Sequence, residues 1–110
     1  MNHDLDLKAQ VKQILKVVQE LAPGKSVELR IPPYAAIQCV AGSTHRRGIP
    51  PNVVEMSAET LISLLESPDQ WQLCCETGAI SASGANSNLG NLFVQLSKLM
   101  NSGLRSENGE

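Results

Sequence analysis

The stretch from Ser57 to Gly84 decides the fold, and it reads SAETLISLLESPDQWQLCCETGAISASG. Ser57 is a residue type that caps helices, so a helix is predicted to begin directly after it. Ser67 is followed by Pro at the first helical position and by Gln at the third, which predicts a second helix with a capping box. Gly78 can adopt the left-handed conformation that ends such a helix, and residues 79–84 then predict a short strand. The stretch offers no evident nucleophile, base or ligand set.

The chain before this stretch predicts one helix and three strands. Residues 6–21 carry apolar side chains at three- and four-residue steps, which is typical of an amphipathic helix. Residues 26–31 alternate between apolar and polar, which is typical of a half-buried strand. Residues 34–40 predict a second strand. Residues 52–56 predict a third strand, which we expect in the middle of the sheet because Val53 and Val54 are both apolar.

The chain after this stretch predicts a last amphipathic helix capped by Asn88. Its apolar stripe consists of Leu89, Leu92, Phe93, Leu96, Leu99 and Met100. We expect residues 1–103 to form one domain. The polar residues 104–110 predict a disordered tail.

This order of elements predicts an α+β fold, in which helices cover a small sheet of about four strands. The sheet is expected to be mainly antiparallel, because Pro32 and Pro33 form a tight connection between the first two strands. A mixed sheet is the open alternative, since the last strand follows a helical crossover.

Composition and charge exclude several classes of function. The 110 residues carry a net charge of −2, which gives no electrostatic footprint for nucleic acid. No run of apolar residues is long enough to span a membrane, and the first residues lack the features of a secretory signal. The odd number of cysteines, two of them adjacent, indicates reduced thiols and a cytoplasmic protein.

Three groups of side chains are candidates for chemistry, and each has a plain structural alternative. Arg46 and Arg47 can bind an anionic head group, but they also fit a solvated loop or an oligomer interface. The cysteines and His45 lack the spacing of a zinc site or a thiol nucleophile, so no metal and no cofactor is expected. The apolar stripe of the last helix fits a ligand cavity and ordinary packing on the sheet.

Several segments together resemble the sterol carrier protein family, and more narrowly its short bacterial, largely actinobacterial branch. The segments are residues 71–84, Arg30 to Tyr34, Gln38, residues 45–51 and Asn52 to Glu55. The resemblance extends from about Leu15 to Leu99. It implies a hydrophobic cavity between sheet and helices that holds a sterol, a fatty acid or an acyl-CoA, and it does not imply an enzyme.

The predicted function is therefore non-catalytic binding or carriage of an apolar small molecule. The rival hypothesis is a protein–protein interaction or dimerisation module without a small-molecule ligand, and a homodimer is compatible with both. We expect an apolar chain in the cavity and an anionic head near the loop. The candidate ligand-binding residues are Ile62, Leu65, Trp71, Phe93, Leu96, Arg46 and Arg47.

Overall fold

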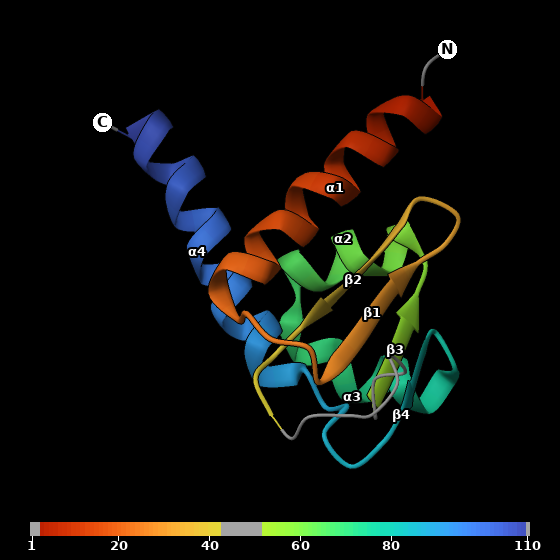
Figure 1. Cartoon of the computed structure of the whole chain (residues 1–110). Helices are drawn as coiled ribbons and strands as arrows, with labels where there is room; N and C mark the ends of the chain where they lie inside the picture. Colours follow the sequence, from red (N-terminus) through yellow and green to blue (C-terminus); the bar gives the residue numbers. More distant parts are fainter. Residues whose placement is uncertain (1–2, 43–51, 110) are drawn as a thin grey trace.

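The computed structural model describes the backbone of residues 3–42 and 52–109, and the side chains of residues 4–42 and 52–101. Four helices, one 3-10 turn and four strands follow one another along the chain (Figure 1). They are α1 (His3–Leu21), β1 (Val27–Ile31), β2 (Ala35–Cys39), β3 (Asn52–Met56), α2 (Ala58–Glu66), η1 (Pro68–Gln70), α3 (Trp71–Thr77), β4 (Ile80–Ser83) and α4 (Gly90–Gly109).

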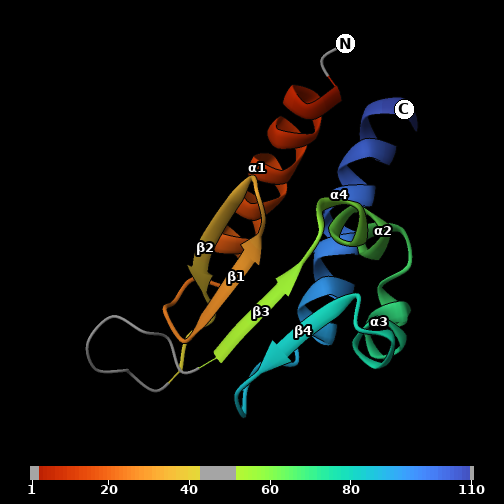
Figure 2. The same ribbon diagram turned by 90° about the vertical axis from the view of Figure 1, so that its right-hand side faces the viewer.

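The strands form one mixed sheet in the order β2-β1-β3-β4 (Figure 2). The outer pairs are antiparallel, β1 with β2 and β3 with β4, whereas the central strands β1 and β3 run parallel. The predicted α+β fold is thus confirmed. The parallel pair does not arise at the helical crossover, because the chain through α2 and α3 returns β4 antiparallel to its neighbour β3.

The core lies between one face of the sheet and the helices (Figure 2). In β1, Val27, Leu29 and Ile31 are fully buried, while the intervening Glu28 and Arg30 lie on the opposite face. The guanidinium Nε of Arg30 is 3.0 Å from Glu28 Oε2, and its Nη1 is 3.9 Å from Glu55 Oε1. These exposed ion pairs stabilise the fold little, so the helix-covered face provides most of the driving force.

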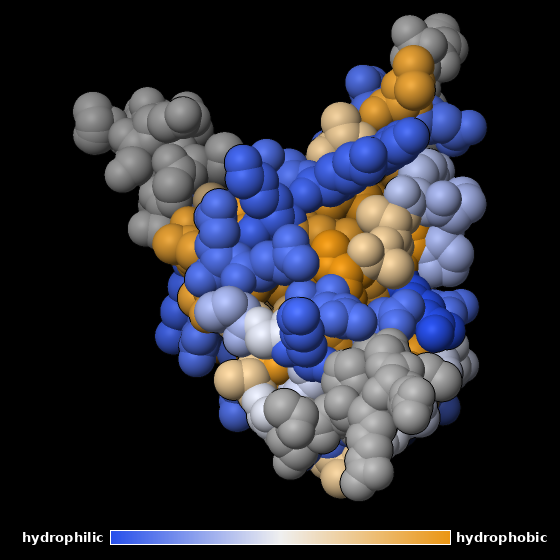
Figure 3. Space-filling model, viewed as in Figure 1, coloured by the Kyte–Doolittle hydropathy of each residue, from blue (hydrophilic) through white to orange (hydrophobic). Residues whose placement is uncertain are grey.

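Helix α1 is amphipathic, as its sequence predicts. Its buried residues face the core, whereas hydrophilic side chains follow its outer side in Figure 3. Hydrophobic side chains gather below this row, over β1 and β2. The helix is also tied to the edge strand, because Gln19 Nε2 donates a hydrogen bond to the carbonyl oxygen of Gln38 at 3.2 Å.

The helical stretch after β3 begins as predicted but continues differently. The Ser57 hydroxyl accepts a hydrogen bond from the Thr60 N–H at 3.1 Å, so the first cap is confirmed. Ser67 makes no capping hydrogen bond with its side chain, and the predicted capping box is wrong. Its own N–H donates to the Ser63 carbonyl at 2.9 Å and so completes the last turn of α2. A 3-10 turn follows, and α3 begins only at Trp71.

The two predicted helix ends have different outcomes. Gly78 ends α3 with a φ of 89°, in the left-handed region that glycine tolerates, as the sequence predicts. Helix α4 instead continues past Gly103 to Gly109, through residues whose polar composition predicts a tail. Extending an existing helix needs no new nucleation, so a polar segment can continue one. The domain boundary at residue 103 stays a prediction.

The buried side chain of Asn52 connects three parts of the fold. Its Nδ2 donates to the Ser26 carbonyl oxygen, and its Oδ1 accepts from the Asn86 N–H, both at 2.8 Å. The first bond holds the start of β1 beside the start of β3. The second holds the loop that leads from β4 to α4, and thereby fixes where α4 begins.

We expect Asn52→Leu to lower the free energy of unfolding by roughly 2–3 kcal/mol. The substitution leaves the buried Ser26 carbonyl without its partner, which costs roughly 1–3 kcal/mol, and also removes the bond to Asn86. Urea denaturation followed by circular dichroism measures the change. The matched control is Asn91→Leu at an exposed position of α4, where we expect a change within about 0.5 kcal/mol. Equal effects of both substitutions would contradict the role given to Asn52.

Candidate functional site

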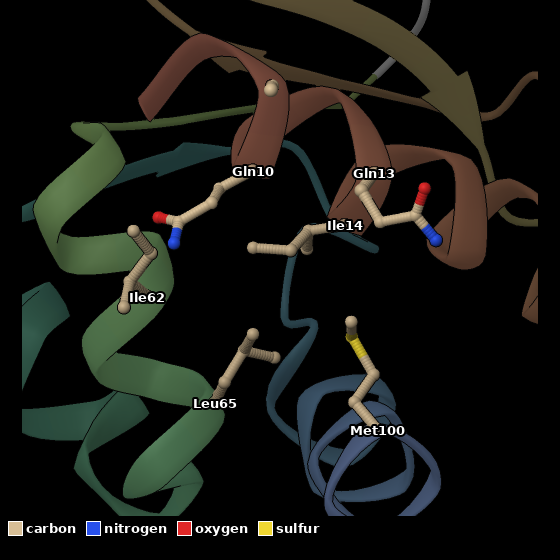
Figure 4. A pocket seen from close by; sticks show the side chains of 7 residues that line it. Gln10, Gln13, Ile14, Ile62, Leu65 and Met100 are labelled. Carbon is tan, nitrogen blue, oxygen red and sulfur yellow. The ribbon is translucent and has the colours of Figure 1, made fainter. Parts of the chain in front are cut away.

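A groove of about 410 Å³ lies between helices α1, α2 and α4 (Figure 4). Its lining is largely apolar, and two side-chain amides are the only polar side-chain groups among the described residues that line it. The lining residues are Ala9, Gln10, Gln13, Ile14, Ile62, Leu65 and Met100. A groove of this size and character is typical of a site for a small apolar molecule.

The helical repeat brings these side chains together. Gln10 lies three residues before Gln13 and four before Ile14 on α1, and the amides of the two glutamines lie on either side of Ile14 (Figure 4). Ile62 and Leu65 are three residues apart on α2 and face them across the groove (Figure 4). Met100 of α4 completes the lining. Ile14 is buried, whereas Ile62, Leu65 and Met100 are only partly buried and so keep apolar surface for a ligand.

The separation of α2 and α4 is fixed by hydrogen bonds between these two helices. The buried Ser97 hydroxyl donates to the Leu65 carbonyl oxygen at 2.6 Å. Asn101 Nδ2 in turn donates to Ser97 Oγ at 3.3 Å. The carbonyls at the end of a helix lack partners within the helix. Ser97 therefore satisfies a carbonyl of α2 and keeps Leu65 next to α4.

The structure separates the candidate residues that the sequence groups together. Ile62 and Leu65 line the groove. Phe93 and Leu96 are fully buried in the core, and Trp71 is 5% exposed with its ring stacked on that of Phe93 at 5.8 Å. These three side chains do not line the groove. Arg46 and Arg47 lie outside the described residues, so their predicted role at the mouth stays a prediction.

Sequence reasoning missed most of the α1 side of the groove. The three- and four-residue spacing places Ile14 in the apolar stripe of the helix predicted over residues 6–21 and Gln13 on its polar side. The usable signal is the pair Gln10 and Gln13, whose long uncharged side chains border the stripe next to Ile14. Met100 belongs to the stripe of the last helix, but that pattern alone does not distinguish a lining residue from a core residue.

Three surface hollows that described residues line are more polar than the groove. One of about 510 Å³ lies beside Trp71, one of about 560 Å³ lies where α1 ends and α4 begins, and one of about 430 Å³ lies on the open sheet face beside Arg30. They are as large as the groove, but none has its apolar lining. Burying an apolar ligand releases most free energy where the surrounding surface is apolar too, so the groove is the best candidate site.

The described thiols do not form a reactive or metal-binding centre. Cys39 is fully buried, and burial raises the pKa of its thiol to about 11. Burial, with the nearby Cys74 and Glu76, also raises the pKa of Cys75. A raised pKa reduces the fraction of reactive thiolate. Among the residues with described side chains, no group of three or more His, Cys, Asp or Glu side chains can hold a metal ion.

We expect Cys39 to resist alkylation in the folded protein at pH 8. Its buried thiol stays protonated and out of contact with the reagent, whereas Cys74 and Cys75 are partly exposed. Iodoacetamide labelling followed by mass spectrometry of the intact protein measures the number of modified thiols. The variant in which both Cys74 and Cys75 are replaced by Ser should stay unlabelled until urea unfolds it. Rapid labelling of that variant under native conditions would contradict the burial of Cys39.

Phe93→Ala should destabilise the domain by about 3–5 kcal/mol, as expected for the loss of a core aromatic side chain. The substitution removes the ring that stacks on Trp71. Thermal and urea denaturation measure the loss. Leu99→Ala is the control on the same helix, because Leu99 is 52% exposed, and we expect it to change stability by no more than about 0.5 kcal/mol. A loss below about 1 kcal/mol for Phe93→Ala would place this ring outside the core.

Comparisons with known proteins agree on the type of domain. The family model described as bacterial SCP ortholog, where SCP stands for sterol carrier protein, matches residues 4–94. A solved structure of the ubiquinone synthesis protein UbiJ-SCP2 superposes with a TM-score of 0.51 at 13% identity, covering 93% of this chain and 97% of that chain. At this identity the superposition shows a shared fold. A search of curated proteins found no match.

Proposed function

The chain belongs to the family of bacterial sterol carrier protein orthologs, and from this membership we propose that it binds or carries an apolar small molecule without catalysing a reaction. The groove between α1, α2 and α4 is the observation that carries this proposal. The ligand classes to consider are lipids, fatty acids, acyl-CoA and sterol-like molecules. The similar solved structure is that of a ubiquinone synthesis protein. That name describes the similar protein and does not identify the ligand of this chain.

The energetics of the groove favour an apolar occupant. Ile62, Leu65 and Met100 are partly exposed without a ligand. An apolar chain that covers them releases about 25 cal/mol for each Å² of apolar surface that leaves water. At about 30 Å³ for each water-sized group, a groove of about 410 Å³ holds on the order of a dozen non-hydrogen atoms. A longer ligand would extend beyond the groove.

The lining also supports a role without catalysis. It contains aliphatic side chains, a thioether and two amides, and none of these acts as a general acid, a general base or a nucleophile. Phe93, Leu96 and Trp71 belong to this proposal as the packed core behind the groove, not as its surface. Reduced thiols support a location in the cytoplasm. No helix among the described residues is long and apolar enough to cross a membrane.

A substitution that fills the groove tests the proposal. Ala9 is small, exposed and part of the lining, so Ala9→Trp places a large ring in the groove with little effect on the core. We expect this variant to bind a fluorescent apolar probe, such as a pyrene-labelled acyl ester, at least tenfold more weakly than the unmodified protein. Fluorescence titration gives the dissociation constants. Ala36→Trp, at an exposed position of strand β2, is the control and should bind the probe normally.

Native mass spectrometry of protein purified from cells, combined with light scattering, separates this proposal from the rival interaction module. The expected result is a chain that carries lipid. Protein that carries no lipid, binds no apolar probe and forms a strict dimer would overturn the proposal and favour a dimerisation module.

A further inference from the structure

We propose that the groove selects uncharged apolar ligands whose polar group is a carbonyl or a hydroxyl, and that it disfavours fatty acids and other anions. This inference rests on the proposed function, because it names the class of ligand for the same groove. It differs from the prediction made from the sequence, in which Arg46 and Arg47 bind an anionic head group.

The polar side-chain groups that the described lining offers are two amides. Gln10 and Gln13 each offer a carbonyl oxygen that accepts and an amino group that donates hydrogen bonds. Both residues are exposed and line the groove, and neither amide bonds to another residue with a described side chain, so both are available to a ligand. The two amides lie on either side of Ile14 (Figure 4), and each of them complements an ester, a ketone or a hydroxyl group, all of which are neutral.

A carboxylate has no such partner among the described residues that line the groove. No charged side chain belongs to the described lining, so an anion that enters exchanges its water for two neutral amides and aliphatic side chains. Removing an ionised group from water without a paired opposite charge is far more unfavourable than removing a hydrogen-bonded neutral group. The groove therefore favours the neutral member of any two ligands with the same apolar chain.

The described charged side chains of α1 and α2 that lie one turn from lining residues carry both signs. Asp6 lies one turn before Gln10 on α1, and Glu59 and Glu66 lie one turn on either side of Ile62 on α2. Lys12 lies one turn after Ala9, and Lys16 one turn after Gln13. All five are exposed to solvent, where salt screens their fields. They do not create the concentrated positive potential that draws an anion into a site.

Two probes that differ only in charge test the inference, namely pyrene-dodecanoic acid and its methyl ester. At pH 8 and 0.15 M salt we expect the ester to bind at least tenfold more tightly than the acid, equivalent to about 1.4 kcal/mol. Equal or tighter binding of the acid would overturn the inference while leaving the proposed function intact. Binding of neither probe would instead overturn the proposed function.

A charge placed in the lining separates selection by the groove from the greater intrinsic hydrophobicity of the ester. Gln13→Lys provides the missing cation, so the affinity for the acid relative to the ester should rise at least tenfold. Gln72→Lys makes the same change at an exposed position of α3, next to Glu76, and should leave that ratio unchanged. If Gln13→Lys also leaves the ratio unchanged, the ligand end does not meet the amides and the inference is wrong.

Discussion

The structure depends on burying one face of a four-stranded sheet. Val27, Leu29 and Ile31 of β1 and Val54 of β3 are fully buried on that face, and burial of apolar surface is the main favourable contribution to folding. The opposite face carries Glu28, Arg30 and Glu55 and needs no cover. All four helices must therefore meet over a single surface. Their shared position on it produces both the core and the groove.

The groove follows from this crowding of helices. Helix α2 is short, with nine residues, and lies between two helices of about twice its length. Its C-terminal end is fixed to α4 by the Ser97 hydroxyl. Helix α1 packs toward the edge strand β2, to which Gln19 connects it. Each helix is therefore held by a different partner. The three helices do not pack tightly against one another along the groove, and apolar side chains remain partly exposed between them.

The order and type of the elements could be predicted from the sequence, because each depends on local signals. The alternation in β1, the cap of Ser57 and the left-handed Gly78 act within a few residues of chain. The capping box predicted at Ser67 is also a local signal, but that prediction is wrong. Its N–H completes the last turn of α2, and although Ser67 also directly precedes η1, its side chain makes no capping hydrogen bond.

The pairing of strands could be predicted only in part. The proline connection between β1 and β2 is a local signal for an antiparallel pair, and that pair is observed. The parallel pair of β1 and β3 joins strands separated by β2 and by residues 43–51. The burial pattern of the two strands does not indicate that they pair, because β1 and β3 show the same alternation of buried and less buried residues. What specifies it is long-range: Asn52 at the start of β3 bonds to the carbonyl of Ser26 at the start of β1.

The candidate site was the hardest part to predict, because core and lining residues share one composition. Phe93 and Leu96 are the large apolar side chains that a sequence suggests for a cavity, yet they fill the interior completely. Ile62 and Leu65 have the same chemistry and line the groove. The difference lies in what the neighbouring helix places opposite each residue. Phe93 meets Trp71, whereas Ile62 faces Gln10 of α1 (Figure 4), whose amide cannot pack as an apolar core does and so leaves the space open to a ligand.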